Sequence, residues 1–420
     1  MSMSGILIFI VVFGILVFVH EFGHFIVAKK SGVLVREFSI GMGPKLFQKM
    51  YHQTTYTIRW LPLGGYVRLA GPDDAAEIDP GITVVLAKNE HDLVNRIDAS
   101  ESDLPIEGIP VQVKNADLVD TLTIEGYENG AEDNLQTYNV DHDATIIDQT
   151  GSELIIAPRD TQFQEANIWQ KIATNIAGPL MNILLGFVVF MIWSLSTTGP
   201  LTTSIKSTVP NSPAAQVGMK AGDQITTING SKITSWDQIP AEIDRAGRKD
   251  VRITVKRGTE TKSFAVKPKI VETAGQKVAQ VGIYPASNNA IGAKVNRGFS
   301  MAVDTTTMIF RALGNLVASF SLNKLSGPVG IYSQTAQMSK LGFTYVLAFL
   351  ASISINLGIV NLLPIPGLDG GKLLLNIVEL FRRKPIPVEK EGIVNLIGFG
   401  LLLLLIIAVT GNDIYRYFIK

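Results

Sequence analysis

The sequence contains no cysteine, and charged residues make up only 18% of its 420 positions. The absence of cysteine excludes disulfide bonds, thiolate metal sites and cysteine nucleophiles, so histidine and carboxylate side chains are the candidate metal ligands. A soluble domain carries about 25% charged residues, so the scarcity of charge favours a membrane protein. Basic and acidic residues balance at 37 each, and net charge therefore gives no indication of a nucleic-acid partner.

Long hydrophobic runs are abundant. Four of them can cross the ~30 Å hydrocarbon core of a bilayer, which takes about 20 residues. The first run could instead be a signal peptide, but no basic segment precedes it and no small-residue cleavage site follows it. We therefore predict four transmembrane helices, at about residues 6–28, 172–195, 343–364 and 393–410.

Two basic clusters predict the orientation, because lysine and arginine are enriched in cytoplasmic loops. One cluster follows the first span, and the other lies between the third and fourth spans. With an even number of spans, both termini and the segment between the second and third spans are expected to be extracytoplasmic, in a multi-pass protein of the cell membrane. The clusters are Lys29, Lys30, Arg36, Lys45 and Lys49, and Arg382, Arg383, Lys384 and Lys390.

The segments between the spans differ in composition. Residues 31–72 predict a membrane-associated β-region, and residues 73–168 an acidic, β-rich cytoplasmic insert with a solvated surface. Residues 198–290 predict one extracytoplasmic α/β domain. Residues 291–342 predict an amphipathic helix, lying on the membrane or packed on the spans, and then a Gly-Pro loop. The four spans fall in segments 1–30, 169–197, 343–381 and 382–420, the last of which begins with a cytoplasmic loop.

The first span ends in HEFGH, residues 20–24, which matches the metalloprotease pattern H-E-x-x-H. Residues four apart share a helix face, so His20 and His24 can direct two imidazoles at one metal ion, and Glu21 can act as general base on a water molecule there. Zinc suits neutral imidazole ligands. The alternative is a polar helix end near the membrane interface, but ionisable residues inside a span are costly and are functional candidates by default.

A catalytic zinc site needs a third protein ligand, and Asp369 is the candidate. It lies in NLLPIPGLDGGK, residues 361–372, at the end of the third span, and is the only acidic residue between Phe343 and Val378. Proline and glycine break the helix there, which is tolerated at membrane depth where the backbone lines a protein cavity. The alternative role for Asp369 is a helix cap at the interface.

Three further residues are candidates for contact with a substrate. The amide of Asn361, within an apolar span, could donate to the oxygen of a reacting carbonyl, or it could form an interhelical hydrogen bond. Gly41 and Gly43 lie where a backbone could approach another chain closely, so this region could bind an unwound substrate as an added strand.

These motifs, in this order, resemble the site-2 proteases, specifically the bacterial RseP-like group, and the resemblance covers almost the whole chain. Residues 38–47 resemble its membrane-associated β-loop, residues 175–182 its second span, and residues 326–331 the segment before its third span. Residues 212–230 resemble the core of a PDZ domain, present here once. The acidic stretch is a departure, because it is longer than the resemblance leads us to expect.

The resemblance implies a polytopic α-helical membrane protein with four transmembrane helices, a membrane-associated β-region and one extracytoplasmic PDZ-like domain. It implies Zn²⁺ bound by His20, His24 and Asp369, with Glu21 as catalytic base and Asn361 at the substrate or oxyanion; the predicted topology places this site towards the cytoplasmic side. The implied activity is that of an intramembrane zinc metalloprotease in regulated intramembrane proteolysis. Its substrates would be single-span membrane proteins, such as anti-sigma factors or remnant signal peptides.

The PDZ-like domain leaves two roles open: it could bind a peptide C-terminus, or it could exclude proteins with bulky outer domains. The alternative function for the whole chain is a PDZ-containing membrane scaffold or chaperone with a vestigial zinc site. A zinc transporter is disfavoured, because the chain has four spans and one three-ligand site.

Overall fold

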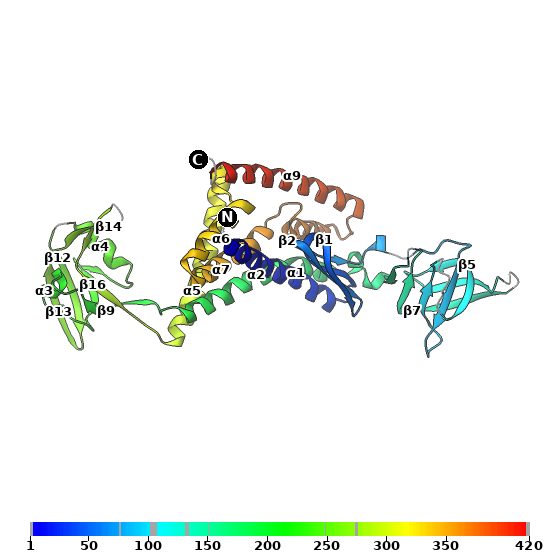
Figure 1. Ribbon diagram of the computed structural model, residues 1–420, viewed down its shortest axis with the longest axis horizontal. Coiled ribbons are helices and arrows are strands. Elements are labelled where there is room, and N and C mark those ends of the chain that lie inside the picture. The colour runs from blue at the N-terminus through cyan, green and yellow to red at the C-terminus, as the bar shows by residue number, and fades with distance from the viewer. Residues whose placement is uncertain are drawn as a thin grey trace. The chain divides into compact units, whose positions relative to one another are not determined.

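A computed structural model describes residues 3–74, 77–100, 107–130, 134–149, 151–247, 249–273 and 276–416 (Figure 1). The chain divides into two compact units, and each is described by itself. One unit comprises Met1–Gly186, Ile309–Gly342 and Ser352–Lys420, and the other comprises Phe187–Met308 and Phe343–Ala351.

Four helices of the described chain are long and apolar enough to cross a membrane, as the sequence predicts. The third predicted segment, residues 343–381, divides into two helices separated by a turn, because prolines and glycines interrupt it. A further helix precedes it where the Gly-Pro loop is predicted. The helices are α1 (Met3–Lys30), α2 (Ile168–Ser196), α6 (Pro328–Leu341), α7 (Phe343–Asn361), α8 (Asp369–Arg382) and α9 (Val388–Ile414).

Glycine allows the helices of the first unit to approach closely. A Cβ atom at Gly23 of α1 would lie 2.5 Å from the carbonyl oxygen of Ala177 in α2, and a Cβ atom at Gly358 of α7 would lie 2.6 Å from that of Pro179. Such distances are too short for any side chain, so α1 and α7 both pack against the α2 backbone. This packing positions the site described below.

The region predicted to be β-structure at the membrane is a long antiparallel hairpin of β1 (Val35–Tyr51) and β2 (Thr54–Leu69). Its outer part exposes many large apolar side chains, and its base lies against α1. Exposed apolar surface of this kind suits contact with lipid. The exposed apolar side chains include Met42, Leu46, Phe47, Met50, Trp60 and Leu61.

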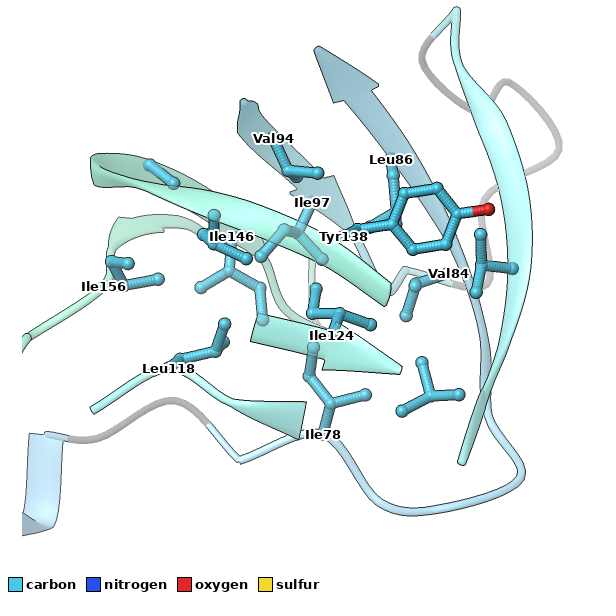
Figure 2. Packing of buried hydrophobic residues seen from close by; sticks show 14 residues of the cluster. Ile78, Val84, Leu86, Val94, Ile97, Leu118, Ile124, Tyr138, Ile146 and Ile156 are labelled. Atoms are coloured by element: carbon cyan, nitrogen blue, oxygen red, sulfur yellow. The ribbon is translucent and has the colours of Figure 1, made fainter. Parts of the chain in front are cut away.

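The acidic insert is a small β-barrel. Its strands follow the order β4-β3-β5-β6-β7-β8, and a parallel pairing of β4 with β7 closes a ring of five strands. The ring encloses an apolar core in which Leu86, Ile97 and Ile124 are fully buried (Figure 2). The strands are β3 (Thr83–Lys88), β4 (Val94–Asp98), β5 (Ile109–Asp117), β6 (Thr123–Glu128), β7 (Leu135–Ile147) and β8 (Glu153–Ile155).

The second unit contains a sheet in the order β13-β12-β10-β9-β16, with β11 paired to β10. The buried carboxylate of Asp223 accepts hydrogen bonds from Arg257 Nε at 2.6 Å and Nη2 at 2.8 Å. The elements are β9 (Leu201–Thr208), α3 (Pro213–Gln216), β10 (Gln224–Ile228), β11 (Ser231–Lys232), α4 (Gln238–Ala246), β12 (Val251–Arg257), β13 (Glu260–Val266), β14 (Lys269–Thr273), β15 (Gln276–Gln280) and β16 (Ile283–Ser287).

The predicted amphipathic helix is α5 (Ile291–Ala318). Within the second unit it packs on the last part of α2: a Cβ atom at Gly298 would lie 2.8 Å from the Met191 Cα atom, and the Arg297 guanidinium lies 4.7 Å from the centre of the Trp193 ring. Phe299 of α5 is 52% exposed. Of the two predicted positions for this helix, the structure therefore supports packing on a span.

Candidate metal centre and active site

One face of α1 presents the two histidines of the H-E-x-x-H pattern. Since they are one helical turn apart, their rings lie together, and the two Nε2 atoms are 3.3 Å apart. Both side chains are largely buried, with 11% exposure for His20 and 12% for His24. Burying two imidazoles side by side in apolar surroundings is costly unless something binds their lone pairs.

Asp369 reaches the same point from the start of α8. Its Oδ2 atom lies 3.0 Å from His20 Nε2 and 3.3 Å from His24 Nε2. The turn before it requires glycine at position 367, where φ is +93°, and α8 packs against that turn at Gly370, where a Cβ atom would lie 2.1 Å from the Leu363 carbonyl oxygen. The turn thus brings the carboxylate back to α1.

These three side chains are a group that could hold a metal ion, and their spacing fits zinc. Ligands at about 2.0–2.1 Å in a tetrahedron lie about 3.3 Å from one another. The three measured separations of 3.0, 3.3 and 3.3 Å match that edge. Two imidazoles and one carboxylate also leave a fourth position for water or substrate, as catalytic zinc requires.

The backbone of α2 fixes His24. Its Nδ1 atom lies 2.7 Å from the Thr174 carbonyl oxygen. A carbonyl only accepts, so Nδ1 carries the proton and Nε2 presents a lone pair to the metal position. A Cβ atom at Gly178 would lie only 2.2 Å from His24 Nε2, so the ring occupies the space that a side chain there would fill.

An ion pair ties α2 to the helix that carries Asp369. Lys171 Nζ, at the start of α2, lies 3.0 Å from Glu379 Oε1 in α8. Both side chains are mostly buried, with 9% and 17% exposure. The sequence does not indicate this pair, because its members lie 208 positions apart in the chain.

Glu21 follows His20 on α1, half-buried, and the hairpin covers it from one side. A Cβ atom at Gly65 of β2 would lie 3.0 Å from Glu21 Cγ and 2.9 Å from Val17 Cγ1. The base of the hairpin therefore touches the helix at the candidate catalytic base.

The remaining predicted site residues lie near these elements. Asn361 is the last residue of α7 and is half-buried; within the described residues, the contacts that join the two histidines to Asp369 do not include it. Gly41 and Gly43 lie in β1 with φ values of +87° and +85°. The close approach at Gly41 is to its own partner strand, since a Cβ atom there would lie 2.6 Å from the Leu61 carbonyl oxygen.

A His-His-Asp cluster beside a glutamate, with both histidines on a helix that is long and apolar enough to cross a membrane, indicates a membrane metalloprotease. In agreement, residues 8–405 match the sequence pattern of peptidase family M50. The chain belongs to this family, that of the site-2 proteases, and is an intramembrane zinc metalloprotease.

Curated relatives match along their whole length. The chain is 45% identical over 421 residues to the probable protease eep of Enterococcus faecalis, covering 99% of this chain and 100% of that protein. It is 40% identical over 423 residues to the regulator of sigma-W protease RasP of Bacillus subtilis, covering 100% of both. A putative zinc metalloprotease of Streptococcus pneumoniae is 43% identical over 426 residues, covering 100% of both.

Among solved structures, the PDZ domain of the SdrC-like protein of Listeria monocytogenes matches 21% of this chain and 90% of that chain. The identity is 26% and the TM-score is 0.17.

Proposed function

We propose that His20, His24 and Asp369 bind the catalytic zinc ion and that Glu21 is the general base for hydrolysis of peptide bonds in single-span membrane proteins. The observation that carries the proposal is the meeting of three ligand atoms at separations of 3.0–3.3 Å, contributed by two helices far apart in the sequence. Zinc in such a site supplies Lewis-acid polarisation of a carbonyl and lowers the pKa of water.

Proton transfer and stabilisation of the reacting carbonyl are assigned to different side chains around the site. Glu21 removes a proton from the attacking water and delivers it to the leaving amine. The amide of Asn361, at the end of α7, donates to the oxygen of the reacting carbonyl. The largely buried position of the ligands limits access of bulk water, which strengthens these interactions.

A substrate must lose helical structure before it can react, because a transmembrane helix satisfies its own peptide groups. We propose that the hairpin binds the unwound segment as an added strand near Gly41 and Gly43. Contact between Gly65 and the Glu21 side chain supports this role, because it places a strand beside the catalytic base. Helix-breaking residues in a substrate would therefore favour cleavage.

The predicted topology assigns the zinc site and the PDZ-like domain to opposite sides of the membrane. We propose that the zinc site lies towards the cytoplasmic side and that residues 198–290 form one extracytoplasmic PDZ-like domain. The relative named regulator of sigma-W protease supports anti-sigma factors as one class of substrate. Deleting residues 199–285 separates the two roles of the domain: a size filter predicts cleavage of untrimmed substrates, and a recruiter of peptide C-termini predicts loss of cleavage.

The decisive experiment compares Glu21→Gln with Glu389→Gln, a matched change at an exposed glutamate of α9. We expect Glu21→Gln to retain zinc but to cleave a single-span substrate about 10²–10⁴-fold more slowly, while the control cleaves normally. His20→Ala should lose both zinc and cleavage. Unchanged cleavage by Glu21→Gln would exclude the proposed mechanism and would return attention to a scaffold or chaperone.

A further inference from the structure

A further residue of α2, Asn182, contacts the proposed zinc site. Its side chain is completely buried, and its Nδ2 atom lies 3.2 Å from Nδ1 of His20. Its Oδ1 atom is buried and has no hydrogen-bond partner among the described residues. The Ser354 hydroxyl, in α7, donates to the Asn182 backbone oxygen at 2.6 Å, so this residue lies where three helices meet.

Which end of the Asn182 amide faces His20 determines which ring nitrogen of His20 carries the proton. If Nδ2 donates to Nδ1, the ring proton must be on Nε2, where it would block the metal position. If the amide is turned by half a rotation, Oδ1 accepts Nδ1–H and Nε2 presents a lone pair, which the metal requires. Either orientation leaves one end of the amide unpaired, so hydrogen bonding alone does not favour one over the other. Metal binding favours the orientation in which Oδ1 faces Nδ1–H, because the metal requires the lone pair on Nε2.

We infer that Asn182 is a positioning residue for the zinc ligand His20, with its side-chain oxygen holding the imidazole as the Nδ1–H tautomer. This inference rests on the proposed zinc site. His24 provides the parallel, because the Thr174 carbonyl of the same helix accepts its Nδ1–H. One helix, α2, then sets the tautomer of both histidine ligands, although it contributes no ligand itself.

The test measures zinc affinity of the purified full-length protein in detergent by competition with a chelator. Asn182→Leu removes the acceptor but keeps the number and branching of the side-chain heavy atoms, and we expect zinc affinity to fall about 10–100-fold. Asn182→Asp keeps an acceptor oxygen and should bind zinc within a few-fold of the unchanged protein. Asn376→Leu, which removes another buried amide from α8, is the control and should bind zinc normally.

A second readout separates ligand positioning from general packing. With cobalt(II) in place of zinc, Asn182→Leu should shift the visible absorption bands of the bound metal, while Asn182→Asp should preserve their tetrahedral pattern. If leucine impairs folding, Asn182→Ala makes the same comparison with a smaller side chain. Rescue by aspartate supports the inference.

Two results would overturn the inference: unchanged zinc affinity in Asn182→Leu, or an equal loss in the leucine and aspartate variants. His20→Ala distinguishes this failure from failure of the proposed site. If His20→Ala still binds zinc tightly, the site itself is wrong. If it loses zinc while Asn182→Leu does not, only the role of Asn182 is wrong.

Discussion

Replacing Gly178 by alanine tests how closely α2 packs against the metal site. The added Cβ atom would lie 2.2 Å from His24 Nε2, whereas ordinary contact needs about 3.5 Å. The ring, the helix or both must therefore move by roughly 1 Å. Zinc sites tolerate about ±0.2 Å in their ligand distances, and a misplacement of 1 Å can cost about 10²-fold in catalysis.

We expect Gly178→Ala to bind zinc at least about tenfold more weakly and to cleave about 10²-fold more slowly. Chelator competition and cleavage of a single-span substrate measure the two effects. Gly14→Ala is the matched control, because nothing lies within 4 Å of a Cβ atom at that position of α1; alanine there should favour the helix by up to ~1 kcal/mol. Helix propensity favours alanine over glycine at both positions, so it cannot cause a loss at Gly178. Normal zinc affinity and activity in Gly178→Ala would therefore refute the close packing of α2 against His24.

Three further predictions concern contacts outside the metal ligands. Lys171→Met leaves the buried Glu379 carboxylate unpaired and should destabilise the protein by about 3 kcal/mol; a lower thermal midpoint in detergent, recovered in part by adding Glu379→Gln, would confirm it. Asp413 Oδ2 accepts hydrogen bonds from the backbone N–H groups of Gly327, just before α6, and of Gly330 in its first turn, so Asp413→Ala should cost about 1 kcal/mol in thermal unfolding and Asp413→Asn much less. The hydrogen bond from Arg257 holds the pKa of Asp223 below its ordinary 3.8, so its stabilising effect is present above about pH 4 and is lost as pH falls further. The protection factors of the amide hydrogens in β10 and β12, each corrected for the intrinsic exchange rate at that pH, should then fall on acidification, and Asp223→Asn should reduce that dependence.

Much of the site was predictable, because the spacing of residues along a helix determines which side chains lie on the same face. His20 and His24 are four residues apart, and this alone predicts that their rings meet. Asp369 was predictable as the only carboxylate in an apolar segment with helix-breaking neighbours. The structure confirms that all three side chains meet, although Asp369 begins a separate helix and does not end the third span.

The contacts that α2 makes were not predictable. The acceptor for His24 is a backbone carbonyl, and every residue has one, so Thr174 carries no distinguishing signal. Gly178 and Asn182 stand out in an apolar span, but their partners depend on how α1 and α2 cross. Prediction of the barrel in the insert was limited in the same way. Its short β-rich segments were recognisable in the sequence, but the β4–β7 pairing that closes the ring depends on contacts between distant segments.

The two sides of α1 contact different parts of the protein. One side holds the imidazoles against α2, where the Thr174 carbonyl accepts a hydrogen bond from Nδ1–H of His24 and so leaves Nε2 available to a metal. The neighbouring side holds Glu21 against β2, where Gly65 leaves no side chain between the strand and the carboxylate. A peptide added to the hairpin would thus lie next to the base, while its own backbone groups are satisfied by a strand and no longer by a helix. In the proposed mechanism, unwinding and attack would be coupled, because the hairpin proposed to bind the unwound chain contacts the helix that carries Glu21.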